Sequence, residues 1–224
     1  MIVLGIDSST DNLSIGVALG EEILAEVNLD SQREHASHII GKIEEALAAA
    51  RKTTADIEGV AAAIGPGSFT GLRVGLSVAK GIAVARKLPI IGVSTFEVIA
   101  ERLQTTYTDF YLAAPVRKGE LYLYRVTATS MFPDDIQLIH QTDLSAIVKE
   151  GPVGMIGRAP KDWDTGLQNI IDKTATAISG GEMARIGARR LAEGQSDDPI
   201  TLEPLYIAPS QAEENFVRRQ RKDS

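Results

Sequence analysis

The sequence contains no cysteine among its 224 residues. This absence excludes disulfide bridges, thiolate metal sites and cysteine nucleophiles together. Aromatic residues are also few, at 5% of the chain, and only three histidines occur. The chain needs no covalent or metal link to fold, because a protein of this length buries about 70% of its unfolded surface.

Long hydrophobic runs are absent as well. A bilayer-spanning helix needs roughly 20 consecutive apolar residues, and no stretch of the sequence approaches that length. The opening MIVLGIDSS is apolar but short, with neither a basic leader nor a small-residue cleavage site. It therefore indicates a first strand rather than a signal peptide. We expect a cytoplasmic protein that makes no membrane contact.

The charge balance is acidic, with a formal net charge of −7. We therefore do not expect the protein surface as a whole to bind nucleic acid nonspecifically through electrostatic attraction. The exception is the end of the chain, VRRQRKDS, which carries Arg218, Arg219, Arg221 and Lys222. An exposed, solvated tail is the favoured interpretation, and contact with a phosphate backbone is the alternative.

The first hundred residues alternate in a regular order. Three short apolar or alternating segments separated by turn residues predict a three-stranded meander. Ser31 and Glu34 then stand at capping-box spacing before an apolar stripe of helical period, which predicts a helix to about residue 53. The predicted strands are 2–7, 13–19, 22–29, 59–65 and 89–94, and further helices are predicted from the glycine-rich stretch to about 87 and over 95–104.

A second region begins near residue 105, where TTYTD interrupts the pattern. Strands are predicted at 110–116, 119–126 and 152–157. Ser179 and Glu182 repeat the capping-box spacing before a last helix that ends near Gly194. No internal repeat is visible in the letters, and residues 158–178 follow no clear pattern. We divide the chain into an N-terminal subdomain, 1–104, and a C-terminal α/β subdomain, 105–224.

The glycine-rich stretch GPGSFTGLRVG, residues 65–75, matches neither a phosphate-binding loop, GxxxxGK[ST], nor a dinucleotide turn, GxGxxG. Gly65 and Pro66 predict a turn. Gly71 and Gly75 are four residues apart on one stripe of the following helix, a spacing that lets a neighbouring backbone come close. The stretch therefore favours a packing surface over a phosphate site.

The helix after this turn has two apolar stripes about 135° apart at 100° per residue. A helix on its own sheet normally hides one stripe, so the second favours a surface covered by another chain; the alternative is a helix sandwiched within its own domain. One stripe contains Phe69, Leu72, Leu76, Ala79 and Ala83, and the other contains Val74, Val78, Ile82 and Ala85.

Asp7, Ser8 and Ser9 end the first predicted strand, where sugar kinases and actin-like ATPases place groups near Mg²⁺ and phosphate. A second Asp-x-Gly loop should accompany such a site. The one Asp-x-Gly, at 164–166, follows no apolar strand. We therefore interpret Asp7 as a turn or capping residue and keep the three residues only as weak candidates for a vestigial nucleotide site.

The histidines do not predict a metal site. His35 and His38 are three residues apart at a helix start, but nothing connects His140 to them as a third ligand. Ser68 lies in GPGSFTG and not in GxSxG, so hydrolase chemistry has little support. We expect no bound metal, no cofactor and no catalytic residue.

Several stretches, spread in order over the whole chain, resemble one family. They are IDSSTDNLSIGVAL, the His35 region, GPGSFTGLRVG with AKGIA, PIIGVSTFEVIA, VRKGELY and PLY. This combination is similar to the TsaB (YeaZ-like) family of bacterial subunits that make threonylcarbamoyladenosine in tRNA. The resemblance implies an ASKHA fold (actin, Hsp70 and sugar-kinase type) with two βββαβα subdomains.

The resemblance also implies a non-catalytic paralogue of TsaD, the metal-binding subunit that transfers the threonylcarbamoyl group. It implies pairing with TsaD through the first two helices, addition of the ATPase TsaE, homodimers through the same helices when TsaD is absent, and tRNA contact only through the complex. The implied pairing residues are Ile39, Ile43, Leu47, Gly71, Leu72, Gly75, Leu76, Ala79, Ile82 and Ala83.

The sequence departs from the family pattern at one visible position. Val116 precedes Arg117 where the family usually has an aspartate. The alternative function, from a different class, is an autonomous enzyme: an ATP-dependent enzyme of the same fold or a glycoprotease-like peptidase. It rests on Asp7 and on analogy of fold, which is weak evidence for function.

Overall fold

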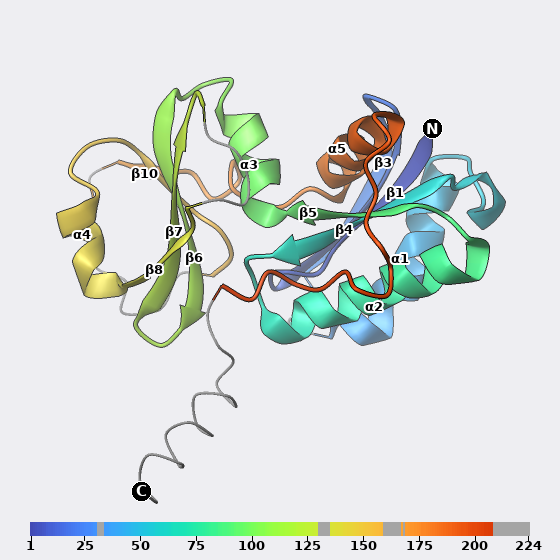
Figure 1. Ribbon diagram of the computed structural model, residues 1–224, viewed down its shortest axis with the longest axis horizontal. Coiled ribbons are helices and arrows are strands. Elements are labelled where there is room, and N and C mark those ends of the chain that lie inside the picture. Colours follow the sequence, from blue (N-terminus) through green and yellow to red (C-terminus); the bar gives the residue numbers. More distant parts are fainter. Residues whose placement is uncertain (31–33, 130–134, 159–166, 168, 208–224) are drawn as a thin grey trace, which may run out of the picture.

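The computed structural model describes residues 1–30, 34–129, 135–158, 167 and 169–207. Its first sheet has the strand order β3-β2-β1-β4-β5 (Figure 1). Strand β1 pairs antiparallel with β2 and parallel with β4. The strands are β1 (Ile2–Asp7), β2 (Asn12–Leu19), β3 (Glu22–Asp30), β4 (Gly59–Gly65) and β5 (Ile90–Ser94).

The second sheet repeats this topology. Its order, β10-β9-β6-β7-β8, places an antiparallel meander beside parallel strands, with β6 in the position that β1 holds in the first sheet. The chain is therefore a structural duplication, although its letters show no repeat. The strands are β6 (Asp109–Arg117), β7 (Glu120–Thr127), β8 (Gln137–His140), β9 (Val153–Met155) and β10 (Ile170–Ile171).

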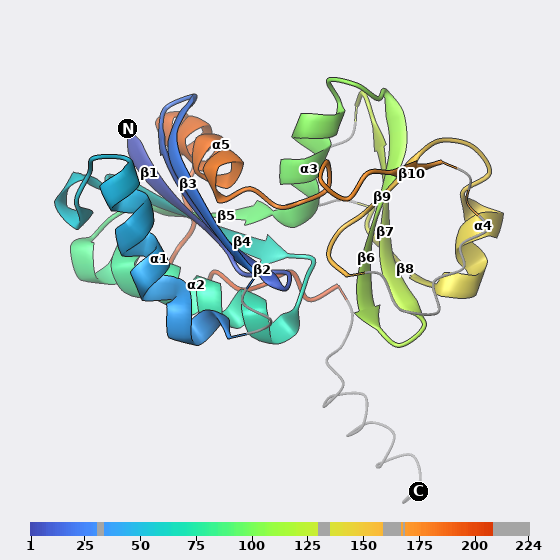
Figure 2. The same ribbon diagram turned by 180° about the vertical axis from the view of Figure 1, so that it is seen from behind.

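Helices cover both faces of the first sheet. Helices α1 (His35–Ala49) and α2 (Phe69–Arg86) lie side by side on one face, and α5 (Gly180–Ala192) crosses the opposite face (Figures 1 and 2). Gly5 and Gly16 let α5 approach, because a Cβ at Gly16 would lie 2.1 Å from the Gly181 nitrogen. Helix α5 thus packs with the N-terminal sheet, although the sequence division placed it within residues 105–224.

Helix α3 (Thr95–Leu103) does the reverse: it precedes the sequence boundary but packs against the second sheet. Its Phe96 ring stacks on Tyr124 of β7 at 6.1 Å between centroids, and it shares a buried cluster with β6 and β7. The remaining short elements are two 3₁₀ turns, Thr54–Asp56 and Gln141–Asp143, and α4 (Leu144–Ile147). Each subdomain therefore receives one helix from the other side of the sequence boundary.

Ion pairs connect α3 to α5. The Glu101 carboxylate accepts hydrogen bonds from Arg185 Nη2 at 2.5 Å and Arg189 Nη2 at 2.7 Å. Glu97 pairs with Arg190, and Arg102 pairs with Glu182. Since α3 packs on one sheet and α5 on the other, these pairs join the two subdomains.

We expect Glu101→Gln to lower the free energy of unfolding by about 1–2 kcal/mol, because two arginines lose a charged acceptor. Chemical denaturation measures this. Glu45→Gln is the control, since Glu45 is 54% exposed and its one ion pair among the described residues is with Lys42. Its effect should stay within about 0.5 kcal/mol. Equal effects of the two variants would contradict this role of Glu101.

Most predicted elements are confirmed. Ser179 caps α5, its Oγ accepting a hydrogen bond from the Glu182 amide at 3.0 Å. Helix α1 begins at His35 after Glu34 and ends at Ala49, four residues before the predicted end; Ser31, of the other predicted capping box, lies outside the described residues. Strands β8 and β10 were not predicted, because β8 has four largely exposed residues and β10 only two.

Candidate functional site

Asp7 lies at the end of β1 and is fully buried. The Ser9 amide donates a hydrogen bond to its Oδ1 at 3.2 Å, whereas Oδ2 has no hydrogen-bond partner among the described residues. Burial raises the pKa of Asp7 to about 7, because an ionised carboxylate is poorly solvated inside the protein. Asp7 is thus a buried turn residue.

This pKa predicts a pH dependence of stability. Between the unfolded pKa near 4 and the folded value near 7, the folded state holds the Asp7 proton and the unfolded state does not, so stability falls as pH rises. We expect Asp7→Asn to remove this pH dependence. Between pH 4 and pH 8 the free energy of unfolding of the unaltered protein should fall by a few kcal/mol relative to that of the variant. Urea denaturation of both proteins across this range measures it. Parallel stability curves would contradict the raised pKa.

The turn after β1 is held against α2. The Ser68 amide donates to the Ser9 carbonyl at 2.6 Å, and Ser8 Oγ donates to the Gly71 carbonyl at 2.8 Å. A Cβ at Gly71 would lie 2.0 Å from the Ser8 carbonyl oxygen, and one at Gly75 would lie 2.2 Å from Ser8 Oγ. The prediction of a close backbone approach is therefore confirmed, but the approaching backbone belongs to this chain and not to a partner helix.

The ten implied pairing residues need a correction. Nine are buried by the chain's own sheet, and Ile82 is half-buried against the same core. The helical pattern of apolar residues does not determine which stripe of a helix faces the sheet. The stripe that contains the implied pairing residues faces the sheet of this chain. The nine buried residues are Ile39, Ile43, Leu47, Gly71, Leu72, Gly75, Leu76, Ala79 and Ala83.

The opposite side of the same two helices is open. We call it the outer face and define it by Ile40 and Gly41 on α1 with Ser77, Gly81, Val84 and Ala85 on α2, all exposed. Ile40 is 55% exposed and Val84 is 54% exposed. A Cβ at Gly41 or at Gly81 would meet no atom of the described residues within 4 Å. Each glycine costs about 1 kcal/mol in a helix relative to alanine, and no described residue packs closely enough against Gly41 or Gly81 to require one.

The remaining candidate residues have structural partners. His35 is buried, with Nε2 2.8 Å from the Thr10 carbonyl oxygen, whereas His38 is exposed and faces Glu34 at 3.9 Å. Ser68 caps α2, accepting a hydrogen bond from the Gly71 amide at 3.2 Å. Within the described parts of the chain, no group of three potential ligands gathers to hold a metal. The Asp-x-Gly at 164–166 and the basic tail lie outside these parts.

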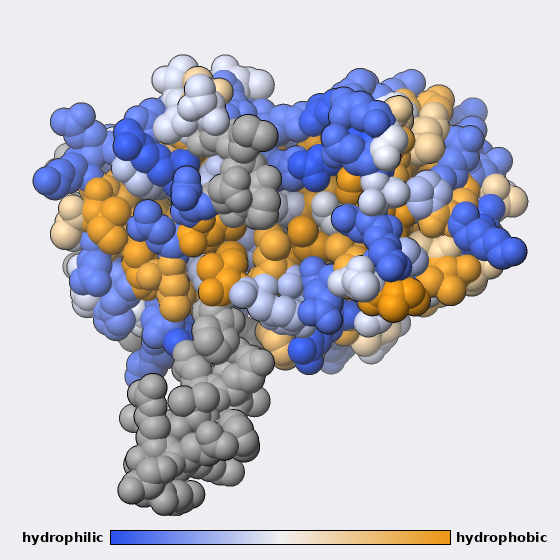
Figure 3. All heavy atoms as spheres, viewed as in Figure 1, coloured by the Kyte–Doolittle hydropathy of each residue, from blue (hydrophilic) through white to orange (hydrophobic). Residues whose placement is uncertain are grey.

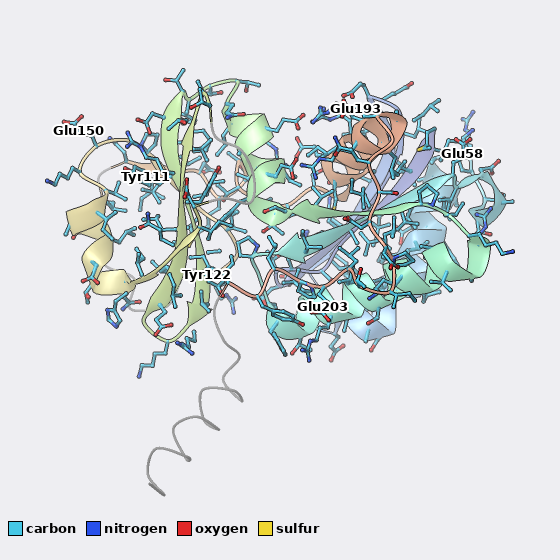
Figure 4. All side chains as sticks on the ribbon, in the orientation of Figure 1. Glu58, Tyr111, Tyr122, Glu150, Glu193 and Glu203 are labelled. Carbon is cyan, nitrogen blue, oxygen red and sulfur yellow. The ribbon has the colours of Figure 1, made fainter. Side chains whose placement is uncertain are left out.

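A cleft of about 830 Å³ separates the two subdomains. Its N-terminal wall is formed by the turn after β1 and the first turn of α2, and its C-terminal wall by the ends of β6 and β9 and by Tyr122 of β7, labelled in Figure 4. Asp7 is not among its lining residues. Val116, at the position where the family usually has an aspartate, also lines the cleft and packs against the core.

A segment from the end of the chain crosses this region, and we call residues 197–207 the C-terminal strap (Figure 1). Its Leu205 amide donates to the Ile64 carbonyl at 2.8 Å, and Lys80 Nζ donates to the Leu202 carbonyl at 3.0 Å. At its end, Tyr206 Oη accepts hydrogen bonds from Arg73 at 3.1 and 3.2 Å. The strap has neither helical nor strand periodicity, so the sequence did not predict it.

Two duplicated sheets that exchange helices across a cleft define the ASKHA class. A solved structure of YeaZ from Pseudomonas aeruginosa matches 92% of this chain and 99% of its own, with a TM-score of 0.71 at 18% identity. Component A of (R)-2-hydroxyglutaryl-CoA dehydratase from Acidaminococcus fermentans gives a TM-score of 0.52 at 11% identity, covering 86% of this chain and 99% of its own. These likenesses confirm the predicted fold.

Sequence comparison narrows the class. The family model of TsaD, tRNA N6-adenosine threonylcarbamoyltransferase, matches residues 22–144. The tRNA threonylcarbamoyladenosine biosynthesis protein TsaB of Escherichia coli is 27% identical, over 92% of this chain and 94% of its own. A tRNA N6-adenosine threonylcarbamoyltransferase of Geobacter sulfurreducens is 38% identical, over 56% of this chain and 42% of its own. The chain belongs to this family, and within it to the TsaB (YeaZ-like) group.

None of the helices in the part of the chain that the structure describes combines the length and the apolarity that crossing a bilayer requires.

Proposed function

We propose that this protein is a non-catalytic subunit required for threonylcarbamoylation of the adenosine next to the anticodon of tRNA. In this role it pairs with the transferase TsaD and holds it in an active arrangement, together with the ATPase TsaE. The proposal is supported by the name of the E. coli relative and by the family model, which is that of the transferase itself. Contact with tRNA is made through the assembled complex.

The observation that carries the pairing is the outer face of α1 and α2. Half-exposed Ile40 and Val84 provide apolar area, and Gly41 and Gly81 let another backbone come close. Figure 3 shows hydrophobic patches, interrupted by polar residues, in the region of α2 and the strap. We propose that TsaD occupies this face, and that a second copy of the chain occupies it when TsaD is absent.

The alternative, an autonomous ATP-dependent enzyme or peptidase, has less support. A carboxylate that binds a metal beside a nucleotide must reach the ligand, whereas Asp7 is buried and outside the cleft lining. The Ser9 amide, a potential phosphate donor, already bonds Asp7. One similar P. aeruginosa protein of solved structure is described as having similarity to peptidase YEAZ, but Ser68 here is a helix cap. Mg²⁺-dependent ATP turnover that is lost in Asp7→Asn would restore this alternative.

A reconstituted modification assay tests the proposed function. TsaD, TsaE, unmodified tRNA and the enzyme that forms the threonylcarbamoyl adenylate, the donor that TsaD uses, are combined with and without this protein. We expect threonylcarbamoyladenosine to form only when the protein is present, and the Asp7→Asn variant to support full modification, because Asp7 has no chemical role. Full modification without the protein would refute the proposal.

A further inference from the structure

The C-terminal strap completes the layer that covers one face of the first sheet (Figure 1). Helix α1 packs on β2 and β3, and α2 packs mainly on β4 and β1. The strap begins at the edge of β5, where the Asp197 amide donates to the Ile90 carbonyl at 2.8 Å. Its Leu202 then packs with the cluster beneath α1 and α2, and a Cβ at Gly92 would lie 3.0 Å from Leu202 Cδ1. The strap therefore lies along the flank of α2 that faces away from α1.

The outward surface of this layer extends beyond the outer face. Exposed residues recur every three or four positions along the whole of α2 and form one stripe, about 22 Å long at 1.5 Å per residue. They are Phe69, Arg73, Ser77, Gly81 and Val84. Beside the stripe, the strap places Ile200, which is 75% exposed and whose carbonyl oxygen accepts a hydrogen bond from Lys80 Nζ at 3.3 Å. The outer face thus continues without a break to the strap.

The outer face by itself offers few side chains of the kind that anchor a protein interface. Apart from Ile40 and Val84, its residues are glycine, serine and alanine, whereas the residues that contribute most binding energy in interfaces are enriched in tyrosine, tryptophan and arginine. A partner that bound only these small residues would gain close approach but little buried area. The side chains that supply such area lie at the other end of the stripe.

Phe69, Arg73 and Tyr206 form an aromatic group where the strap meets the first turns of α2. The two rings lie 5.9 Å apart between centroids and are 43% and 47% exposed. The Arg73 guanidinium packs 3.9 Å from the Phe69 centroid and donates a hydrogen bond to Tyr206 Oη at 3.1 Å. Because the rings are already held in place, a partner that covers them loses little side-chain entropy.

We propose that the strap is part of the surface that pairs with TsaD, with Phe69, Arg73 and Tyr206 as its anchor. This inference rests on the proposed function and adds to it a segment from the other end of the chain. A stable interface takes about 800 Å² from each partner, and the strap and its aromatic group add Phe69, Ile200 and Tyr206 to the apolar side chains available on this side. Since one stripe of α2 connects both parts, the same partner covers them.

Calorimetric titration of the full chain with TsaD tests the inference. Ile200→Glu is the decisive variant, because the Ile200 side chain is so exposed that its replacement should not disturb the strap. We expect at least about tenfold weaker pairing, since the interface would bury a charge without a partner. Ile170→Glu is the matched control: Ile170 is 53% exposed on β10, in the other subdomain, and its replacement should leave the affinity unchanged.

Variants of Tyr206 test the aromatic anchor. Tyr206→Ala removes the ring and should weaken pairing at least about tenfold. Tyr206→Phe keeps the ring and loses only the hydroxyl group, so its affinity for TsaD should stay within about threefold of that of the unaltered protein. The thermal midpoint of each variant shows whether it is folded.

The inference is overturned if Ile200→Glu and Tyr206→Ala both pair with TsaD as tightly as the unaltered protein. If these variants keep TsaD but lose TsaE, the strap belongs to the ATPase, and the inference is overturned as well. Gly81→Leu in the same titration separates this result from the proposed function. If Gly81→Leu alone loses TsaD, the outer face remains the pairing surface without the strap. If the unaltered protein does not bind TsaD, the proposed pairing and this inference both fail.

Discussion

Gly71→Ala is expected to destabilise the protein severely, by at least about 3 kcal/mol. The added methyl group would lie 2.0 Å from the Ser8 carbonyl oxygen. That oxygen belongs to backbone between β1 and β2, so no side-chain rotation relieves the overlap. Thermal denaturation should show a midpoint lowered by about 10 °C, if each kcal/mol shifts it by about 2–4 °C in a chain of this size.

Gly81→Ala is the matched control for Gly71→Ala. Both glycines lie in α2, but a Cβ at Gly81 would meet no atom within 4 Å in the described parts of the chain. This variant should gain up to about 1 kcal/mol of stability, since alanine is the better helix former. If both variants were equally stable, the turn after β1 would not contact α2 as closely as the structure shows.

The second large effect concerns pairing rather than folding. Gly81→Leu should fold as well as the unaltered protein but lose TsaD, because a leucine side chain would prevent the close backbone approach that the outer face allows. We expect at least about a hundredfold weaker pairing, measured by calorimetry or by co-elution on size exclusion. Both methods detect the complex itself, so the result does not depend on the modification assay.

Ile147→Arg controls for a nonspecific effect of altered surface. Ile147 is 39% exposed on α4, in the other subdomain, and its replacement should leave pairing intact. If Gly81→Leu still co-eluted with TsaD, Gly81 would not be part of the interface. The thermal midpoint of the variant shows whether it is folded. Loss of pairing in both variants would indicate a different or larger surface.

The sequence predicts the N-terminal sheet well, because its strands and helices are long enough for periodicity to appear. It does not predict that α3 and α5 exchange subdomains, since that depends on contacts such as Phe96 on Tyr124 and on the α3–α5 ion pairs. The duplication could not be seen in the sequence for a similar reason. Two sheets can share the same strand order and pairing without sharing similar sequences.

The pairing residues show the same limit. Leu72, Leu76 and Ala79 are as apolar as a partner surface requires, but the sheet is a nearer partner than another chain, and it buries them. What distinguishes the outer face is not greater hydrophobicity. It is the presence of Gly41 and Gly81 where no described part of the chain approaches them, a property that appears only in three dimensions.

The most direct test of the pairing surface is site-specific photo-crosslinking in the presence of TsaD. A photoreactive amino acid is placed at Ile40 or at Val84 on the outer face, or at Ile147 as a control. We predict crosslinks to TsaD from the first two positions and none from the third. Crosslinks from Ile147 alone, with none from Ile40 or Val84, would contradict the proposed pairing.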